Sequence, residues 1–367
     1  MVFSSLVFLY VFLPLVFIAY NLSKNIDYKN VILVISSLVF YAWGEPSYII
    51  MLLVSLAINY IFGRIIDKTY GTAAGRVSVI LAVAINLGLL GVFKYAGFFV
   101  NNINAFLKLN IPDPKIALPL GISFYTFQTM SYIIDVYRGK THVQKSVIKF
   151  TAYVTMFPQL VAGPIVRYTD IEKELRSRTV TAQDFADGIK RFVSGLCKKV
   201  VIANYAGNAA SLLLDSPRLS VASAWLGILM YAFQIYFDFS SYSDMAIGLG
   251  RMFGFHFMEN FRYPYISRSI TDFWRRWHIS LSTFFRDYVY IPLGGNRYRE
   301  VRNLFVVWFL TGMWHGASWN FIFWGLFYGI MLLIERKSYK KFLQKLPIPL
   351  CYIYTMFVVL IGWALFY

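Results

Sequence analysis

The sequence predicts an all-α polytopic membrane protein, on the evidence of its composition, its apolar stretches and the placement of its charges. Of its 367 residues, 58% are hydrophobic and only 14% are charged, and a soluble domain has too little interior to bury so much apolar surface. A spanning helix needs about 20 mostly apolar residues, so we expect about ten transmembrane or re-entrant helices. The longest apolar stretches are 2–20, 31–43, 48–62, 77–100, 221–236, 321–334 and 350–367.

The basic residues predict an orientation, because lysine and arginine collect in cytoplasmic loops. They follow the first, third and fifth expected helices as Lys24 and Lys29, then Arg64, Lys68 and Arg76, then Arg138, Lys140, Lys145 and Lys149. We expect these loops to be cytoplasmic. The turn at 44–46, the segment 101–115 and the N-terminus would then lie outside.

The formal net charge of +17 does not indicate a nucleic-acid partner. The basic residues are spread over loops between apolar helices, and the cytoplasmic bias accounts for most of them. We therefore expect membrane lipid around the protein and no nucleic acid. The remaining positive charge would favour a phosphate-rich partner such as an acyl carrier protein or coenzyme A.

Motifs for metal or nucleotide chemistry are missing from the sequence. The four histidines show no H-x-x-x-H or H-E-x-x-H spacing and the two cysteines are isolated, so we expect no metal site. The segment 71–76 lacks the Lys-Ser/Thr pair of a P-loop. Because no internal repeat or flexible linker divides the chain, we expect residues 1–367 to form one integral membrane domain.

The first unusual element is the segment 157–165, which contains Pro158, Gly163 and Pro164 within apolar sequence. These residues break a helix, and broken backbone at membrane depth is tolerated only where it is buried in protein or lines a cavity. We expect a kinked or re-entrant wall here.

The next element is a helix around 231–244 that carries Gln234, Asp238 and Ser241 at i, i+4 and i+7. At this spacing they form one stripe, which should face another helix or a wet cavity because a lipid-facing polar stripe is costly. Two interpretations remain open: a structural stripe in which Asp238 pairs with an arginine, or the lining of a reaction chamber.

The segment 269–288 is amphipathic at helical period, and Ser269 with Asp272 resembles a helix start. We expect one helix that lies at the membrane interface or dips into the protein, with His278 at the edge of its apolar face. This histidine is either structural or part of a site. The apolar arc holds Phe273, Trp274, Trp277, Leu281, Phe284, Phe285 and Tyr288, and the opposite side holds Arg275, Arg276, Arg286 and Asp287.

The last element is the run 308–320, where His315 lies between two stretches apolar enough for a bilayer. An ionisable group at membrane depth is costly and therefore marks a candidate site. Gly312 and Gly316, with Gly325 and Gly329 one helix later, should allow close helix packing beside the imidazole. From the residues alone, His315 is a catalytic group, a packed hydrogen-bonded histidine or a proton relay.

Four segments together resemble the membrane-bound O-acyltransferase (MBOAT) family, and most closely its bacterial alginate O-acetyltransferase-like branch. They are Phe157-Pro-Gln-Leu-Val-Ala-Gly-Pro-Ile165, Phe273-Trp-Arg-Arg-Trp-His-Ile-Ser-Leu-Ser282, Arg286-Asp-Tyr-Val-Tyr-Ile-Pro-Leu-Gly-Gly295 and Trp314-His-Gly316. The opening Met1-Val-Phe-Ser-Ser5 is similar to that branch as well. The resemblance implies a ring of membrane helices around a central tunnel. Family members usually continue with further helices, so we expect this chain to lack the last ones.

The resemblance also assigns roles to residues. His315 matches the family's near-invariant membrane histidine and is expected to be the general base, and His278 matches its second characteristic histidine, which would orient or relay. We expect Arg275, Arg276 and Arg286 to hold the phosphates of the donor. The expected substrate and tunnel residues are Gln234, Asp238, Ser241, Trp274, Trp314 and Asn320.

The implied reaction takes an acyl group, in this branch acetyl, from a cytoplasmic thioester such as acetyl-CoA, with no permanently bound cofactor. The group would pass across the bacterial cytoplasmic membrane to hydroxyls of an extracytoplasmic polysaccharide, through a partner that resembles an esterase or acyltransferase. One alternative is D-alanyl transfer from a carrier protein to teichoic acid. An alternative of a different class is a transporter or lipid flippase without covalent transfer.

Overall fold

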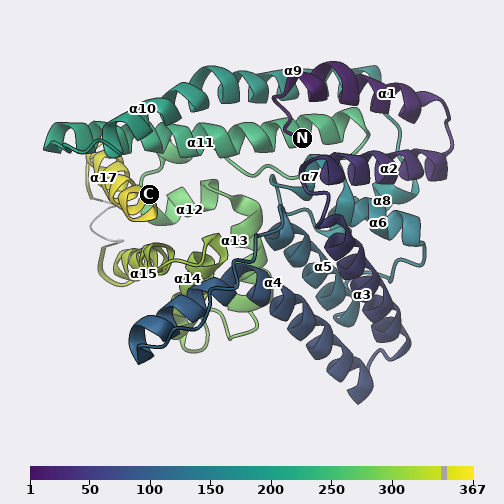
Figure 1. Cartoon of the computed structure of the whole chain (residues 1–367), viewed down its shortest axis with the longest axis horizontal. Coiled ribbons are helices and arrows are strands. Elements are labelled where there is room, and N and C mark those ends of the chain that lie inside the picture. The colour runs from purple at the N-terminus through teal and green to yellow at the C-terminus, as the bar shows by residue number, and fades with distance from the viewer. Residues whose placement is uncertain (340–344) are drawn as a thin grey trace. The chain divides into compact units, whose positions relative to one another are not determined.

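The structure, a computed structural model, describes residues 1–339 and 345–367, and every regular element in this part of the chain is a helix (Figure 1). The predicted all-α class is therefore confirmed. The chain divides into two compact units. The first unit comprises Met1–Val193 and Asp244–Met258, and the second comprises Ser194–Ser243 and Glu259–Tyr367.

Several helices are long and apolar enough to cross a membrane, as the composition predicts. In the described part of the chain there are five: α2 (Ile26–Gly44), α3 (Ile49–Lys68), α4 (Ala73–Leu107), α11 (Val221–Met252) and α17 (Ile348–Phe366). A shorter apolar helix covers Phe8–Asn21. The protein is thus a multi-pass membrane protein, whereas the ring of about ten helices and its tunnel stay predictions.

The remaining elements of the first unit are shorter. They are η1 (Phe8–Phe12), α1 (Leu13–Asn21), α5 (Ile122–Tyr137), α6 (Val147–Thr155), α7 (Phe157–Leu160), α8 (Tyr168–Arg176) and most of α9 (Ala182–Cys197). Two features of this unit matter for the sequence predictions: the polar contacts between α3, α4 and α5, and the break after α6.

Helices α3, α4 and α5 pack against one another through buried amides (Figure 1). Asn59 and Asn86 exchange two side-chain hydrogen bonds of 3.0 and 2.8 Å, and the Thr129 hydroxyl donates to Asn86 Oδ1 at 3.4 Å. Such bonds are common between helices in a bilayer, where an unpaired amide has no water partner.

The predicted helix break at 157–165 is confirmed. Helix α6 ends at Thr155, α7 lasts only from Phe157 to Leu160, and the chain then runs through Gly163 in a left-handed conformation with φ of 106°. This segment is largely buried within the first unit, in agreement with irregular backbone being confined to the protein interior.

The second unit holds the other motifs. Besides most of α11 and all of α17, its elements are η2 (Lys198–Ala203), α10 (Asn204–Leu214), η3 (Pro264–Ile266), α12 (Ile270–Arg276), α13 (Ile279–Phe285), η4 (Arg286–Tyr290), α14 (Glu300–His315), α15 (Trp319–Ile334) and η5 (Glu335–Tyr339). Its core gathers aromatic side chains of α12, α14, α15 and α17, with Trp324, Tyr328 and Trp363 among the most buried.

Helices α14 and α15 lie side by side with almost no space between their backbones (Figure 1). A Cβ atom on Gly312 would collide with the carbonyl oxygen of Phe321, and one on Gly325 with the carbonyl oxygen of Trp308. The glycines therefore permit the close approach that their spacing predicts.

The prediction of one continuous helix over 269–288 is wrong. Ser269 does cap the start, accepting the Asp272 amide at 3.0 Å, but α12 ends at Arg276 and a new helix begins at Ile279. Between them His278 has φ of 44° and ψ of 56°, a left-handed conformation that interrupts the helix. Contacts with Asn260 hold this break.

Candidate active site

A cavity of about 480 Å³ in the second unit brings the two predicted histidines together. His278 lies between α12 and α13, and His315 is the last residue of α14. This volume is within the range of about 300–1,000 Å³ that small-molecule sites occupy. Three of the residues expected to contact the substrate or the donor also line it: Trp274, Arg275 and Arg286.

His278 is 2% exposed, and its contacts come from a residue far away in sequence. Asn260 Oδ1 lies 3.1 Å from His278 Nδ1 and also accepts the Ser280 amide at 3.2 Å and the Ser280 hydroxyl at 2.9 Å. The Asn260 carbonyl accepts the Ile279 amide at 3.0 Å. Asn260 thus binds the first amides of α13 and holds His278 in the break between α12 and α13.

The His278 ring is enclosed mainly by aromatic groups. Its centroid lies 4.7 Å from Phe239, 5.7 Å from Trp314 and 6.5 Å from Phe261. Burial lowers the pKa of His278 well below the ordinary imidazole value, and the nearby His315 lowers it further. His278, which lies outside the candidate membrane spans, is therefore neutral near pH 7.

His315 is partly exposed and packs among aromatic rings, three of which lie within about 5 Å of it. Its ring centroid lies 4.9 Å from Trp314, 4.9 Å from Trp324 and 5.0 Å from Phe366, each close to edge-on. Trp314 contacts both imidazoles, so it fixes the spacing between them although it does not line the cavity.

The wall next to the histidines is aromatic. The Trp274 ring lies 4.8 Å from both Trp308 and Tyr328 and 5.5 Å from Trp324. Its Nε1 is buried with no hydrogen-bond acceptor among the described residues. A buried donor at the edge of a cavity is available to a bound ligand.

The cavity also has a cationic side made by three arginines. Arg286 binds the neighbouring Asp287 at 2.7 Å, and Arg336 binds Glu300 at 2.7 Å. Arg275 is exposed and forms no ion pair in the part of the chain that the structure describes. A free guanidinium beside a cavity suits a phosphate or carboxylate ligand.

The other expected site residues lie elsewhere in the second unit. Gln234 packs against Gly207 of α10, and Asp238 forms an ion pair of 2.6 Å with Lys199, where an arginine was one expected partner. Ser241 is buried and its hydroxyl donates to the Asp238 carbonyl. None of the three lines the cavity. Arg276 instead binds Asp272 at 3.0 Å, and Asn320 is exposed in the first turn of α15.

Three residues of this site have no signal in the sequence. Asn260 contacts His278, which lies 18 positions later in the sequence, and Arg336 lines the cavity from η5. Glu335, 4% exposed, accepts the Ile270 and Thr271 amides at 2.6 and 2.9 Å and so caps α12 from 65 residues away. Only the fold brings these groups to the histidines, because no local spacing connects them.

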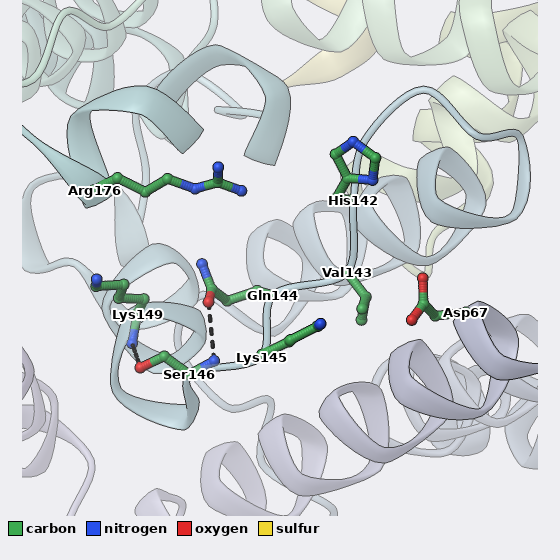
Figure 2. Close-up of a pocket in the computed structure, with 8 residues that line it drawn as sticks. All are labelled: Asp67, His142, Val143, Gln144, Lys145, Ser146, Lys149 and Arg176. Atoms are coloured by element: carbon green, nitrogen blue, oxygen red, sulfur yellow. Dashed lines mark hydrogen bonds between the residues drawn. The ribbon is translucent and has the colours of Figure 1, made fainter.

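A second hollow, of about 490 Å³, lies in the first unit, and Figure 2 shows its lining. Several of its polar groups are already bonded: Gln144 Oε1 accepts the Ser146 amide and Ser146 Oγ accepts the Lys149 amide. Lys149 and Arg176 form ion pairs with Asp27 and Glu172. With these charges compensated, this hollow is a weaker candidate than the cavity with the two histidines.

The fold and the cavity define a class: a helical, multi-pass membrane protein with two histidines facing one ligand-sized cavity. Residues 140–366 match the model of the MBOAT, membrane-bound O-acyltransferase family, and the chain belongs to this family. The predicted family is confirmed, and the protein is an O-acyltransferase. The alternative of a transporter or lipid flippase is therefore wrong.

Relatives at three levels of similarity support this assignment. The chain is 47% identical to a probable alginate O-acetylase AlgI of Pseudomonas aeruginosa, over all of its length and 72% of that protein. It is 36% identical to a peptidoglycan O-acetyltransferase of Helicobacter pylori, over all of its length and 77% of that protein. A teichoic acid D-alanyltransferase of Bacillus subtilis is 31% identical over 58% of each chain.

Proposed function

We propose that this protein transfers an acetyl group from a cytoplasmic thioester, such as acetyl-CoA, to hydroxyls of an extracytoplasmic polysaccharide. The observation that carries the proposal is the single cavity lined by His278, His315 and the free Arg275. The two relatives that match the whole of this chain are named as an alginate O-acetylase and a peptidoglycan O-acetyltransferase. Their names support a polysaccharide acceptor and acetyl as the transferred group.

The chemistry requires a base and a group that stabilises the tetrahedral oxygen. The acceptor hydroxyl attacks the thioester carbonyl, a C–O bond forms, the C–S bond breaks, and the thiolate leaves. We assign His315 as the general base that takes the hydroxyl proton and passes it to the leaving sulfur. His278 orients the acceptor, and the unused Trp274 Nε1–H donates to the developing oxyanion.

The arginines at the cavity are the proposed binding groups for the donor. Coenzyme A carries several phosphates, and a guanidinium binds a phosphate with two parallel hydrogen bonds. Arg275 and Arg286 line the cavity and fit this role, whereas Arg276 is engaged with Asp272.

The cellular setting belongs to the same proposal. The basic loops support a cytoplasmic-membrane protein with its N-terminus outside. An extracytoplasmic esterase-like protein would receive the acetyl group and pass it to the polymer. D-alanyl transfer from a carrier protein is less favoured, because the D-alanyltransferase relative matches only 58% of the chain.

The test is transfer of label from ¹⁴C-acetyl-CoA in proteoliposomes, with alginate and peptidoglycan fragments as acceptors and a candidate partner present. We expect His315→Ala to lower the rate by about 10²- to 10⁴-fold, the usual contribution of a general base. Phe323→Ala, at an exposed position on α15, is the control for folding and insertion. Full transfer by correctly folded His315→Ala protein would contradict the assignment.

A further inference from the structure

The hydrogen bonds around His278 determine which of its nitrogens carries the proton. Asn260 Oδ1 lies 3.2 Å from the Ser280 backbone nitrogen, which can only donate, so this atom of the amide must be the oxygen. The Ser280 hydroxyl, 2.9 Å away, donates to the same oxygen. The orientation of the Asn260 amide is thus fixed independently of the histidine.

His278 Nδ1 lies 3.1 Å from this oxygen and must therefore carry the hydrogen. In a neutral imidazole the other nitrogen then has the lone pair. His278 Nε2 is buried and has no hydrogen-bond partner in the described part of the chain, and the residue lines the cavity. A buried acceptor without a partner is costly, so it is retained where a ligand completes its hydrogen bond.

We propose that Asn260 is a positioning residue that holds His278 as the Nδ1–H tautomer, with the Nε2 lone pair available to accept a hydrogen bond from a second hydroxyl of the acceptor, because the attacking hydroxyl gives its one proton to His315. This role of Asn260 rests on the proposed function. It adds that His278 accepts the hydrogen bond from the substrate and does not donate it. The left-handed backbone of His278 turns the ring into this position, and the two amides that follow it, of Ile279 and Ser280, donate to Asn260.

A purely structural role for Asn260 is the competing explanation, because its side chain also caps α13 through the Ser280 amide. Asn260→Asp separates the two roles. It retains an oxygen for the Ser280 amide, but it places a negative charge beside Nδ1–H, which raises the pKa of His278. His315 is the titratable neighbour that acts on His278.

The positioning role predicts a shift of the pH profile. If His278 works as the neutral form, the acidic limb of kcat/KM should move upward by about one pH unit or more in Asn260→Asp. Asn30→Asp is the matched control, because it adds a charge to another fully buried amide, 2.7 Å from Arg178 in the first unit. An acidic limb of Asn260→Asp that coincides with that of wild type would overturn the positioning role.

Asn260→Leu removes the acceptor altogether. We expect kcat to fall by about 10- to 100-fold, with little change in KM for acetyl-CoA. This fall in kcat should be smaller than the one that His278→Ala causes. In the His278→Ala background, Asn260→Leu should cost no more than about twofold, because residues that act as a unit are not additive. An equal loss in both backgrounds would show that Asn260 does not act through His278.

A measurement of the tautomer does not depend on transfer activity. The chain has four histidines, so ¹⁵N-histidine labelling gives few signals, and His278→Gln assigns those of His278. We expect protonated Nδ1 and unprotonated Nε2 in wild type near pH 7, and a mixture of tautomers in Asn260→Leu. A protonated Nε2 in wild type refutes the tautomer that Asn260 is inferred to hold. Full activity of both His278→Ala and His315→Ala refutes the proposed function and the hydrogen bond from the acceptor to His278, but not that tautomer.

Discussion

Two adjacent arginines on α12 differ in what they contact, and this difference predicts different kinetics. Arg275 lines the cavity without an ion pair among the described residues, whereas Arg276 binds Asp272. A charge-assisted hydrogen bond contributes about 1.5–3 kcal/mol. We expect Arg275→Ala to raise KM for acetyl-CoA by about tenfold and to leave kcat unchanged. A tenfold change corresponds to the lower end of this energy range, as expected for an exposed side chain.

Arg276→Ala is the control for this prediction, since it removes the same charge one position away. Its KM should stay within about twofold of wild type. Steady-state kinetics over a range of acetyl-CoA concentrations measures both variants. Equal effects of the two substitutions would indicate that the overall positive charge, and not a specific contact, attracts the donor. In that case KM for acetyl-CoA should also rise steeply with ionic strength.

At the level of single residues, the sequence could identify His315 as a costly polar group but could not choose among its roles. Its partners come from α14, α15 and α17, and only the folded chain brings Trp324 and Phe366 against it. For His278, the sequence predicts a continuous helix with the ring at the edge of its apolar face. The break at that residue, stabilised by Asn260, turns it into the cavity instead.

At the level of helices, the close contact of α14 with α15 positions the cavity wall, because Trp308 and His315 both belong to α14. Gly325→Ala should push these helices apart, since its Cβ would meet the Trp308 carbonyl oxygen and also the Gly312 Cα at 3.2 Å. Overpacking of this kind costs about 1–3 kcal/mol. We expect a lower unfolding temperature in detergent and reduced acetyl transfer.

Gly329→Ala is the matched control on the same helix. Its Cβ would lie 3.4 Å from the Trp308 Cβ, an ordinary van der Waals distance, and alanine is the better helix former by up to about 1 kcal/mol. Stability should be equal or slightly higher. If both alanine variants unfolded at the wild-type temperature, the packing of α14 on α15 would have to be looser than the structure describes.

The helices themselves were largely predictable, because apolar stretches and helix breakers act locally. The seven apolar stretches each coincide with a helix, and the Pro-Gly segment breaks the chain after α6 as expected. The helix over 269–288 was not predictable in detail, since its interruption depends on Asn260 and its start on Glu335. Contacts between residues distant in sequence override the helical period there.

At the level of the whole molecule, the alternation of basic and neutral loops predicts which side of the membrane each loop occupies. Lysines and arginines lie in the loops between α1 and α2 and between α5 and α6, and in the last turns of α3 and the first turn of α4 on either side of their connecting turn. The segment between α4 and α5 carries only Lys108 and Lys115. An excess of positive charge is retained on the cytoplasmic side, so the first group should be cytoplasmic and the second extracytoplasmic.

Cysteine labelling tests this topology after Cys197 and Cys351 have been replaced by serine. In intact cells, a membrane-impermeant maleimide should label Asn110→Cys but not Lys24→Cys or Lys145→Cys, all three of which are exposed positions. The last two should react only after the membrane is opened. The reverse pattern would invert the orientation, and it would place the proposed cytoplasmic thioester on the wrong side of the basic loops. A transferase with its donor inside and its acceptor outside needs the orientation that the lysines and arginines predict.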